Sequence, residues 1–174
     1  MGMNDELNIR AMREEDCETI AEAFKLQNWN KPVEQYRGYF QEQINDKRLI
    51  LIAEVGGAFA GYLTIVWKTW YPYFLDNNIP EIVDLNVLIK YRKRGIATRL
   101  IEHAESIVAK DYDEIGIGVG LISDYGAAQR LYVKLGYIPD GFGASKNECY
   151  LKYGDVVNAD DDLIMCFTKN LKMK

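Results

Sequence analysis

Hydrophobic and polar residues alternate along the chain with two different periods, which predict a mixture of strands and helices. Alternation at every second residue from Leu7 to Met12 predicts a first strand. The β-rich runs Leu49–Val55 and Ala58–Trp67 are joined by Gly56-Gly57, which suits a hairpin turn because glycine adopts positive φ without strain. Further strands are predicted at Glu81–Leu88, from Ile115 to Val119, from Tyr137 onward and at Leu163–Thr168.

Hydrophobic positions three and four residues apart predict helices between these strands. Four helices are predicted. The first begins at Arg13–Asp16, and the other three extend over Pro32–Ile44, from Ile96 to about Lys110, and over Asp124–Leu135. We expect Asp124 to cap the last of them and Gly136 to end it. Residues Lys68–Pro80 show neither period, so an aromatic loop is expected there.

This order of elements predicts a mixed fold of the α/β (α+β) class. Strands joined by short turns run antiparallel, so a mostly antiparallel sheet of about seven strands with about four flanking helices is expected. One β-α-β unit lies at its centre, from Glu81 to Leu121, and the turn between its strand and helix is the expected ligand site. No linker or repeat divides the 174 residues, so we expect one domain over 1–174 with its core at about 7–169.

Composition narrows the classes of partner. A net charge of −5 is unfavourable for a nucleic-acid binder, so an anionic ligand needs a local basic patch. The chain has no apolar run of about 20 residues for a membrane helix, and Met1–Arg10 lacks the apolar segment of a secretory signal. We therefore expect a cytoplasmic protein that binds neither nucleic acid nor membrane.

Cysteine and histidine positions suggest no metal site and no disulfide framework. The three cysteines are widely spaced without a CxxC pair, so we expect buried, unpaired residues at Cys17, Cys149 and Cys166. His103 lies mid-helix between glutamates, which is typical of a solvated helix face.

Cationic side chains gather where the strand at 81–88 turns into the following helix, at Arg92, Lys93, Arg94 and Arg99. A helix N-terminus carries about half a positive charge, so each cation there costs up to about 1 kcal/mol. A bound anion reverses this, because free backbone N–H groups, the helix dipole and the guanidinium groups then act together. Gly95 and Ala97 leave the backbone uncovered, which favours a polyphosphate ligand over a merely solvated basic loop. No Gly-Lys-Ser/Thr follows, so a P-loop with magnesium is not indicated.

Two motifs resemble those of the GNAT superfamily of acetyltransferases. Arg92-x-x-Gly95-x-Ala97 matches its coenzyme A signature, Gln/Arg-x-x-Gly-x-Gly/Ala, and the strand Leu85–Leu88 precedes it as in the family. Further along, Ala128–Tyr137 matches the family's Ala-x-x-Leu-Tyr-x-x-x-Gly-Phe/Tyr. The resemblance covers about residues 7–169.

The resemblance implies acetyl-CoA as cosubstrate, without a metal. Backbone groups of Val87, Leu88 and Ile89 would bind the pantetheine arm. The diphosphate would lie on the turn formed by Arg92, Lys93, Arg94, Gly95, Ile96, Ala97 and Thr98. The glycines at 116, 118 and 120 are compatible with a close approach to their strand, which would splay from its neighbour to admit the arm. A frequent family asparagine is Tyr125 here, so that contact is not carried over.

Acetyl transfer to an amine needs the amine neutral, which for a lysine-like amine at pH 7 costs roughly 4 to 5 kcal/mol. A base is therefore useful, and the family often places an acidic residue on the central strand. Glu81 and Asp84 are three residues apart and so should lie on opposite faces; we favour Asp84, with Glu81 or water as alternatives. Tyr132 stands at the family's position for the acid that protonates the leaving thiolate; its structural alternative is an aromatic residue packed on the core.

Segments expected to contact the acceptor are Trp67–Phe74, Trp29–Phe40 and the acidic Asp155–Asp162. Acidic and aromatic groups suit a cation, so we expect a small cationic amine resembling a polyamine or an aminoglycoside. Acetylation of a protein or peptide, at its N-terminus or a lysine, is the alternative, and a non-catalytic coenzyme A-binding module is a third class. The resemblance also implies a homodimer, since edge strands of this fold commonly pair between subunits.

Overall fold

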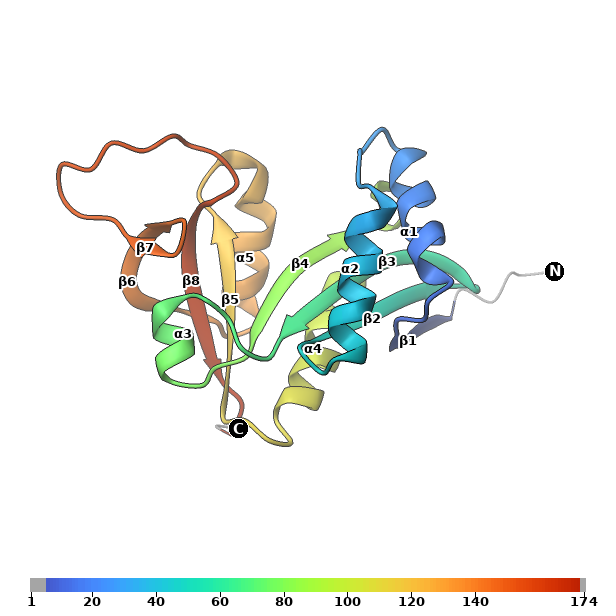
Figure 1. The fold of residues 1–174 in the computed structure, drawn as a ribbon, viewed down its shortest axis with the longest axis horizontal. Helices are drawn as coiled ribbons and strands as arrows, with labels where there is room; N and C mark the ends of the chain where they lie inside the picture. Colours follow the sequence, from blue (N-terminus) through green and yellow to red (C-terminus); the bar gives the residue numbers. More distant parts are fainter. Residues whose placement is uncertain (1–5, 173–174) are drawn as a thin grey trace. The chain divides into compact units, whose positions relative to one another are not determined.

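The structure, a computed structural model, describes residues 6–172, which form eight strands and five α-helices (Figure 1). Contacts divide the chain into unit 1 (Met1–Val66 with Val83–Ala104) and unit 2 (Trp67–Ile82 with Glu105–Lys174). The pair of β4 with β5 is parallel, and the other pairs given below are antiparallel. The predicted mixed α/β class is therefore confirmed, with one strand and one helix more than expected. A single domain over 1–174 stays a prediction.

Unit 1 contains an antiparallel sheet with α1 and α2 packed on a common core. Its elements are β1 (Leu7–Ala11), α1 (Asp16–Lys25), α2 (Val33–Ile44), β2 (Arg48–Val55), β3 (Ala58–Val66), most of β4 (Glu81–Val87) and most of α4 (Ile96–Val108). The predicted hairpin of β2 and β3 turns at Gly56 and Gly57, with φ of 58° and 80°. Helices α1 and α2 lie beside the β2–β3 hairpin (Figure 1), and buried side chains fill the space between, among them Ile20, Phe24, Tyr36, Ile50 and Tyr62.

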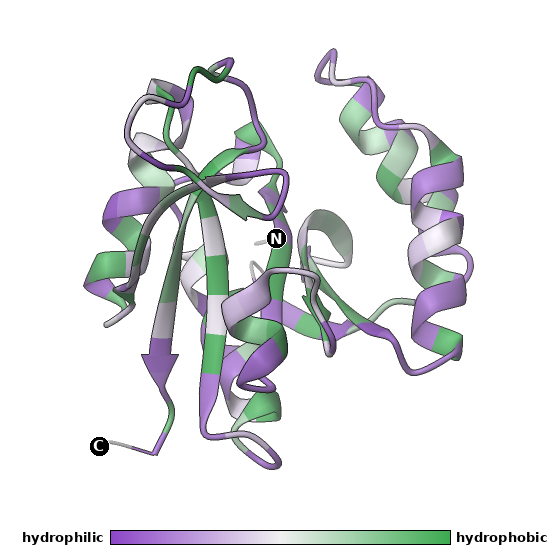
Figure 2. Ribbon diagram, turned by 60° about the vertical axis from the view of Figure 1, so that its left-hand side comes forward, coloured by the Kyte–Doolittle hydropathy of each residue, from purple (hydrophilic) through white to green (hydrophobic). Residues whose placement is uncertain are grey.

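Unit 2 contains the predicted parallel pairing. Its elements are the start of β4, α3 (Pro72–Asp76), the end of α4, β5 (Glu114–Gly120), α5 (Gly126–Lys134), β6 (Ile138–Lys146), β7 (Cys149–Tyr150) and β8 (Leu163–Asn170). Glu81 and Ile82 of β4 pair in parallel with Gly116 and Ile117 of β5. Strand β8 lies between β5 and β6, antiparallel to both, and β7 pairs with β6. Strands and helices alike carry hydrophobic residues among polar or small ones (Figure 2).

Several local predictions need correction. The expected loop at 68–80 contains the short helix α3, which begins with Pro72 because a proline ring is pre-organised for the first helical turn. Asp124 does not cap α5: it belongs to a 3-10 turn over Ser123–Tyr125, and no side chain caps the helix. Gly136 follows α5 at φ 89°, as predicted.

Cys17 and Cys166 are buried, as predicted, whereas Cys149 is exposed, so the prediction for Cys149 is wrong. His103 is exposed on α4, as predicted. In the described part of the chain, no helix has the length and apolar character needed to cross a membrane.

The glycines of β5 admit close neighbours, as predicted, but two of these neighbours are rings of the protein itself. A Cβ added at Gly116 would lie 2.5 Å from the ring of Phe74, and one added at Gly120 would lie 2.4 Å from the ring of Tyr125. The small residues of this strand therefore make room for aromatic packing within unit 2.

Candidate functional site

The turn between β4 and α4 presents exposed backbone at the start of a long helix. The first bond of the helical ladder runs from Arg99 N to Gly95 O at 3.0 Å, so the amides of residues 95–98 have no partner one helical turn earlier. Lys93 and Gly95 have φ of 60° and 77°, and a Cβ added at Gly95 would meet nothing within 4 Å. Successive amides in such a turn form a concavity that suits an anion, and a left-handed non-glycine residue such as Lys93 is a strained feature typical of functional sites.

Basic side chains of this turn are held against aromatic rings and backbone oxygens. Arg92 donates from Nε to Val87 O at 3.2 Å, and its guanidinium lies 5.2 Å from the centre of the Trp29 ring. Lys90 and Arg94 lie over the ring of Tyr91. The turn therefore carries several cations close in sequence to its unpartnered amides, and both kinds of group favour a diphosphate.

Two of the three residues predicted to bind the pantetheine arm already use their amides. Leu88 N donates to Ala60 O at 2.9 Å, and Ile89 N donates to the side chain of Gln27 at 3.0 Å. Their carbonyl oxygens also accept hydrogen bonds, Leu88 O from Tyr91 N at 2.9 Å and Ile89 O from Arg92 N at 3.2 Å. Arm contacts at Leu88 and Ile89 would therefore use the second lone pair of each oxygen.

Asp84 is the centre of a polar cluster within unit 1. Its carboxylate is 17% exposed. The donors around it are Tyr62 Oη at 2.6 Å, Asn86 Nδ2 at 2.6 Å, Tyr39 Oη at 3.0 Å, Gln35 Nε2 at 3.3 Å and Lys31 Nζ at 3.5 Å. Because every one of these groups donates, the cluster stabilises the negative charge of the carboxylate.

The two tyrosines at Asp84 remain protonated at neutral pH. Burial, together with the charge of Asp84, raises the pKa of Tyr39 to about 12 and that of Tyr62 still further. Both hydroxyls therefore stay hydrogen-bond donors to the carboxylate under physiological conditions.

Asp84 also has a left-handed backbone, with φ of 57°, which interrupts the regular alternation of β4. That Glu81 and Asp84 lie on opposite faces of β4 stays a prediction. Glu81 belongs to unit 2, where its carboxylate accepts a hydrogen bond from the hydroxyl of Thr69.

Tyr132 lies in the last turn of α5, in unit 2. Its side chain is buried, and its ring centre is 6.2 Å from that of Tyr137. Burial, with a smaller contribution from Tyr125, raises the pKa of Tyr132 to about 12. The phenol therefore keeps its proton at neutral pH and is a weaker acid than a solvated tyrosine.

The aromatic segment expected to contact the acceptor is mostly packed within unit 2. Trp67 stacks on Tyr112 with ring centres 6.1 Å apart, and Tyr71 and Phe74 are buried. Trp70 is 77% exposed and is therefore the large side chain of this segment that is most open to a ligand.

Two carboxylates of the acidic segment 155–162 already interact with other side chains. Asp160 is paired with Lys146 at 2.6 Å, which lowers the pKa of this carboxyl, and Asp161 accepts a hydrogen bond from Tyr125. Among residues 6–172, no group of three or more histidine, cysteine or acidic side chains is placed to hold a metal ion.

Sequence reasoning missed the partners of Asp84. Lys31, Gln35, Tyr39 and Tyr62 come from three different elements or loops, and no local motif marks them. Asn86 is the one partner close in sequence to Asp84, so it is the partner that a local reading of β4 could have found.

The sequence matches the acetyltransferase (GNAT) family over residues 10–137, which is most of the chain. This chain belongs to the GNAT family. No curated protein matches it in sequence. Solved structures of low identity share the fold. An N-acetyltransferase from Staphylococcus aureus Mu50 is 19% identical with a TM-score of 0.71, and the match covers 96% of this chain and 99% of that one.

Two further solved structures are similar to this chain. The ribosomal-protein-S18-alanine N-acetyltransferase from Escherichia coli has a TM-score of 0.69 at 12% identity, covering 97% of this chain and 96% of that one. Arabidopsis thaliana NAA60, solved with acetyl-CoA, has a TM-score of 0.67 at 17% identity, covering 95% of this chain and 98% of that one.

Membership of the GNAT family makes this protein an acyltransferase that uses acetyl-CoA. The β4–α4 turn fits the diphosphate of this cosubstrate, because its amides precede the helical ladder, its residues include several cations, and a Cβ at Gly95 would meet nothing within 4 Å.

Proposed function

We propose that this GNAT protein transfers the acetyl group of acetyl-CoA to a primary amine of a small, cationic molecule by direct attack in a ternary complex. The observation that carries the proposal is the environment of Asp84, whose carboxylate lies among tyrosine hydroxyls. Lys31 already places an ammonium there, 5.4 Å from the centre of the Phe24 ring and 6.0 Å from that of Tyr62. A carboxylate beside ring faces is a favourable setting for an alkylammonium group.

Residues of the turn between β4 and α4 bind the cosubstrate. The amides of Lys93, Arg94, Gly95, Ile96, Ala97 and Thr98 hold the diphosphate. Arg92 contributes its charge, because its own amide donates to Ile89 O at 3.2 Å. Backbone groups of Val87, Leu88 and Ile89 hold the arm. The bound coenzyme supplies an acetyl thioester. The roles of these residues are supported by the exposed amides and by the open space at Gly95.

Asp84 has the role of orienting the acceptor amine and receiving its proton, directly or through water. Its hydrogen-bond donors hold the carboxylate in place, so electrostatic orientation of the ammonium is its larger contribution. Tyr132 has the role of donor to the leaving sulfur. With its raised pKa it stabilises the charge that develops on sulfur mainly by hydrogen bonding, since complete transfer from so weak an acid is unfavourable.

A protein or peptide acceptor is the second candidate, favoured by the similar structures named for acetylating a ribosomal protein. The two classes are separated by an amine panel, with spermidine, kanamycin and a peptide with a free N-terminus, in which release of the coenzyme A thiol is measured with acetyl-CoA. We expect turnover of the polyamine or aminoglycoside. Turnover of the peptide alone would overturn the proposed acceptor class, and tight coenzyme binding without any turnover would favour a non-catalytic module.

A cytoplasmic location is proposed because the exposed free thiol of Cys149 suits a reducing compartment. A homodimer is proposed by resemblance to the family, and sedimentation of the purified protein tests it.

A further inference from the structure

Lys31 is the one lysine of the described chain that the structure gives an ion pair with Asp84, and its position is unusual for a lysine. The side chain is 22% exposed, although lysines normally extend into water. Its Nζ lies 3.5 Å from Asp84 Oδ1 and 3.5 Å from the hydroxyl of Tyr62. Two ring faces, of Phe24 and Tyr62, complete its surroundings.

The direction of the cosubstrate arm brings its reacting end toward this amine. With the diphosphate at residues 92–98 and the arm along Val87–Ile89, as proposed above, the thioester end would continue back along β4 toward Asp84. Only two residues separate Asp84 from Val87, and a strand advances about 3.3 Å per residue. Lys31 is therefore a primary amine held beside the proposed base at the end of the arm.

We propose that Lys31 is itself an acetyl acceptor, so that the protein acetylates its own side chain when no other amine is present. This inference rests on the proposed function. The Lys31 ammonium first loses a proton to Asp84 or water. The neutral nitrogen then forms a bond to the thioester carbonyl carbon as the carbon–sulfur bond breaks, and a second proton passes from nitrogen to the leaving sulfur. The products are Nε-acetyl-Lys31 and the free thiol of coenzyme A.

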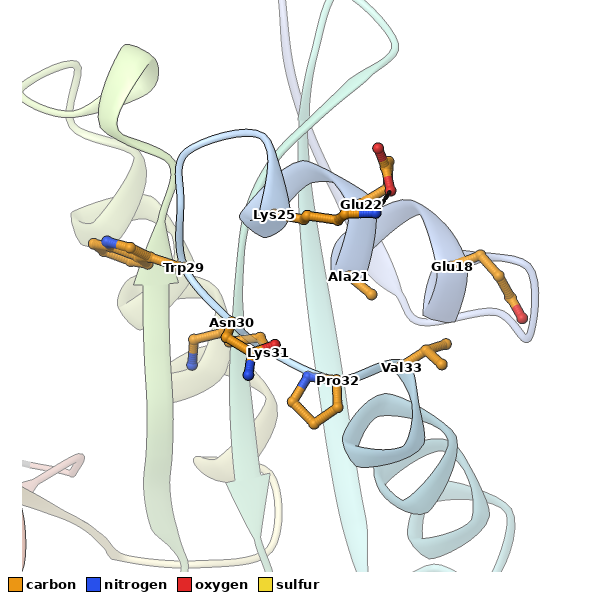
Figure 3. A pocket seen from close by; sticks show the side chains of 9 residues that line it. All are labelled: Glu18, Ala21, Glu22, Lys25, Trp29, Asn30, Lys31, Pro32 and Val33. Carbon is orange, nitrogen blue, oxygen red and sulfur yellow. Dashed lines mark ion pairs between the residues drawn. The ribbon is translucent and has the colours of Figure 1, made fainter.

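The surroundings leave room for the product. Lys31 lines a hollow of about 370 Å³ between α1 and the segment 29–33 (Figure 3), together with Trp29, Pro32 and Val33. An acetylated Lys31 side chain can turn into this hollow when it leaves the carboxylate.

Lys25 is the matched control. It lines the same hollow (Figure 3) but is 80% exposed on α1, where it pairs with the nearby Glu22 at 3.9 Å. In a purely chemical reaction with dissolved acetyl-CoA, the accessible Lys25 should react faster than the shielded Lys31. The order is reversed if bound acetyl-CoA delivers its acetyl group to Lys31.

The test is incubation of the purified full chain with acetyl-CoA alone, followed over time by peptide mass spectrometry. We expect Lys31 to be acetylated at least about tenfold faster than Lys25, and an excess of free coenzyme A to slow Lys31 without slowing Lys25. The Lys31→Arg variant should lose the rapid addition in its intact mass while keeping the positive charge. Gly95→Trp, if it folds, should reverse the order of the two lysines.

Acetylation of Lys31 no faster than of Lys25, in protein that binds acetyl-CoA by calorimetry, overturns the inference and leaves the proposed function standing. Absence of coenzyme binding overturns both. Turnover of an amine of the panel without acetylation of Lys31 would likewise overturn the inference about Lys31 and leave the proposed function standing.

Discussion

Replacing Asp84 with asparagine should destabilise the protein, because the cluster around it supplies only donors. In Asp84→Asn one carboxylate oxygen becomes an NH₂ group. Oδ2 accepts from Tyr39, Tyr62 and Gln35, and Oδ1 accepts from Asn86 with Lys31 nearby, so either orientation of the amide sets donors against donors.

The magnitude follows from the hydrogen bonds lost. A hydrogen bond to a charged group contributes about 1.5 to 3 kcal/mol, and the donor left facing another donor adds a desolvation cost. Because some donors regain water at this part-exposed site, we expect a fall of about 2 to 3 kcal/mol in the free energy of unfolding.

Urea unfolding followed by circular dichroism measures this change. The midpoint should fall by about 1 M, since a slope of about 2 to 3 kcal/mol per M is typical for a small protein. Glu18→Gln is the control, because Glu18 pairs with Arg37 on the exposed surface, and its midpoint should not change measurably. An unchanged midpoint for Asp84→Asn would refute the reasoning that the carboxylate organises this cluster.

The remaining predictions concern catalysis, backbone and pH. Tyr132→Phe should lower turnover by about 100-fold while leaving the Kd for acetyl-CoA unchanged; an equal loss of binding would contradict its role as donor to sulfur. The pKa of Tyr132 is about 12, whereas an unperturbed tyrosine has a pKa of 10.0. Tyr132 should therefore keep its proton up to pH 10.0, and the rate of acetylation of an active amine should not fall through loss of this donor between neutral pH and pH 10.0. Gly95→Ala should cost about 1 kcal/mol of stability in thermal unfolding, because alanine is strained at φ 77°. Burial alone would raise the pKa of Asp16, but hydrogen bonds from Arg10 and the Arg13 amide outweigh it and hold this pKa below 3.8. That stabilisation is present above pH 3.8 and is lost as the pH falls through the lowered pKa, so the Tm of Arg10→Met should depend less on pH in this range than the wild-type Tm.

The regular elements and the turn could be predicted because their signals are local. The period of hydrophobic residues identified β2, β3 and α4, and the short motif around Gly95 identified the place where a strand passes into a helix. Each of these signals lies within a few residues of the feature that it predicts.

The environment of the candidate base could not be predicted, because it is assembled from distant positions. Tyr39 and Lys31 reach Asp84 from sequence separations of 45 and 53 residues, counted from their numbers, and nothing local in β4 encodes them. The left-handed backbone at Asp84 was also hidden, since an aspartate in a strand pattern carries no mark of positive φ. The glycines of β5 had a correct local signal, a small residue that admits a neighbour, but only the fold supplies the rings of Phe74 and Tyr125.

We propose that the amides beside Gly95 hold the diphosphate of acetyl-CoA. Calorimetric titration with acetyl-CoA and with S-acetylpantetheine, which lacks the diphosphate, tests it most directly in the wild type, Gly95→Ala and Gly95→Trp. We predict tight binding of acetyl-CoA and weak binding of S-acetylpantetheine to the wild type, with Gly95→Trp binding both weakly and Gly95→Ala intermediate for acetyl-CoA. Equal affinity of the wild type for the two ligands, or unchanged affinity of Gly95→Trp for acetyl-CoA, would contradict the account.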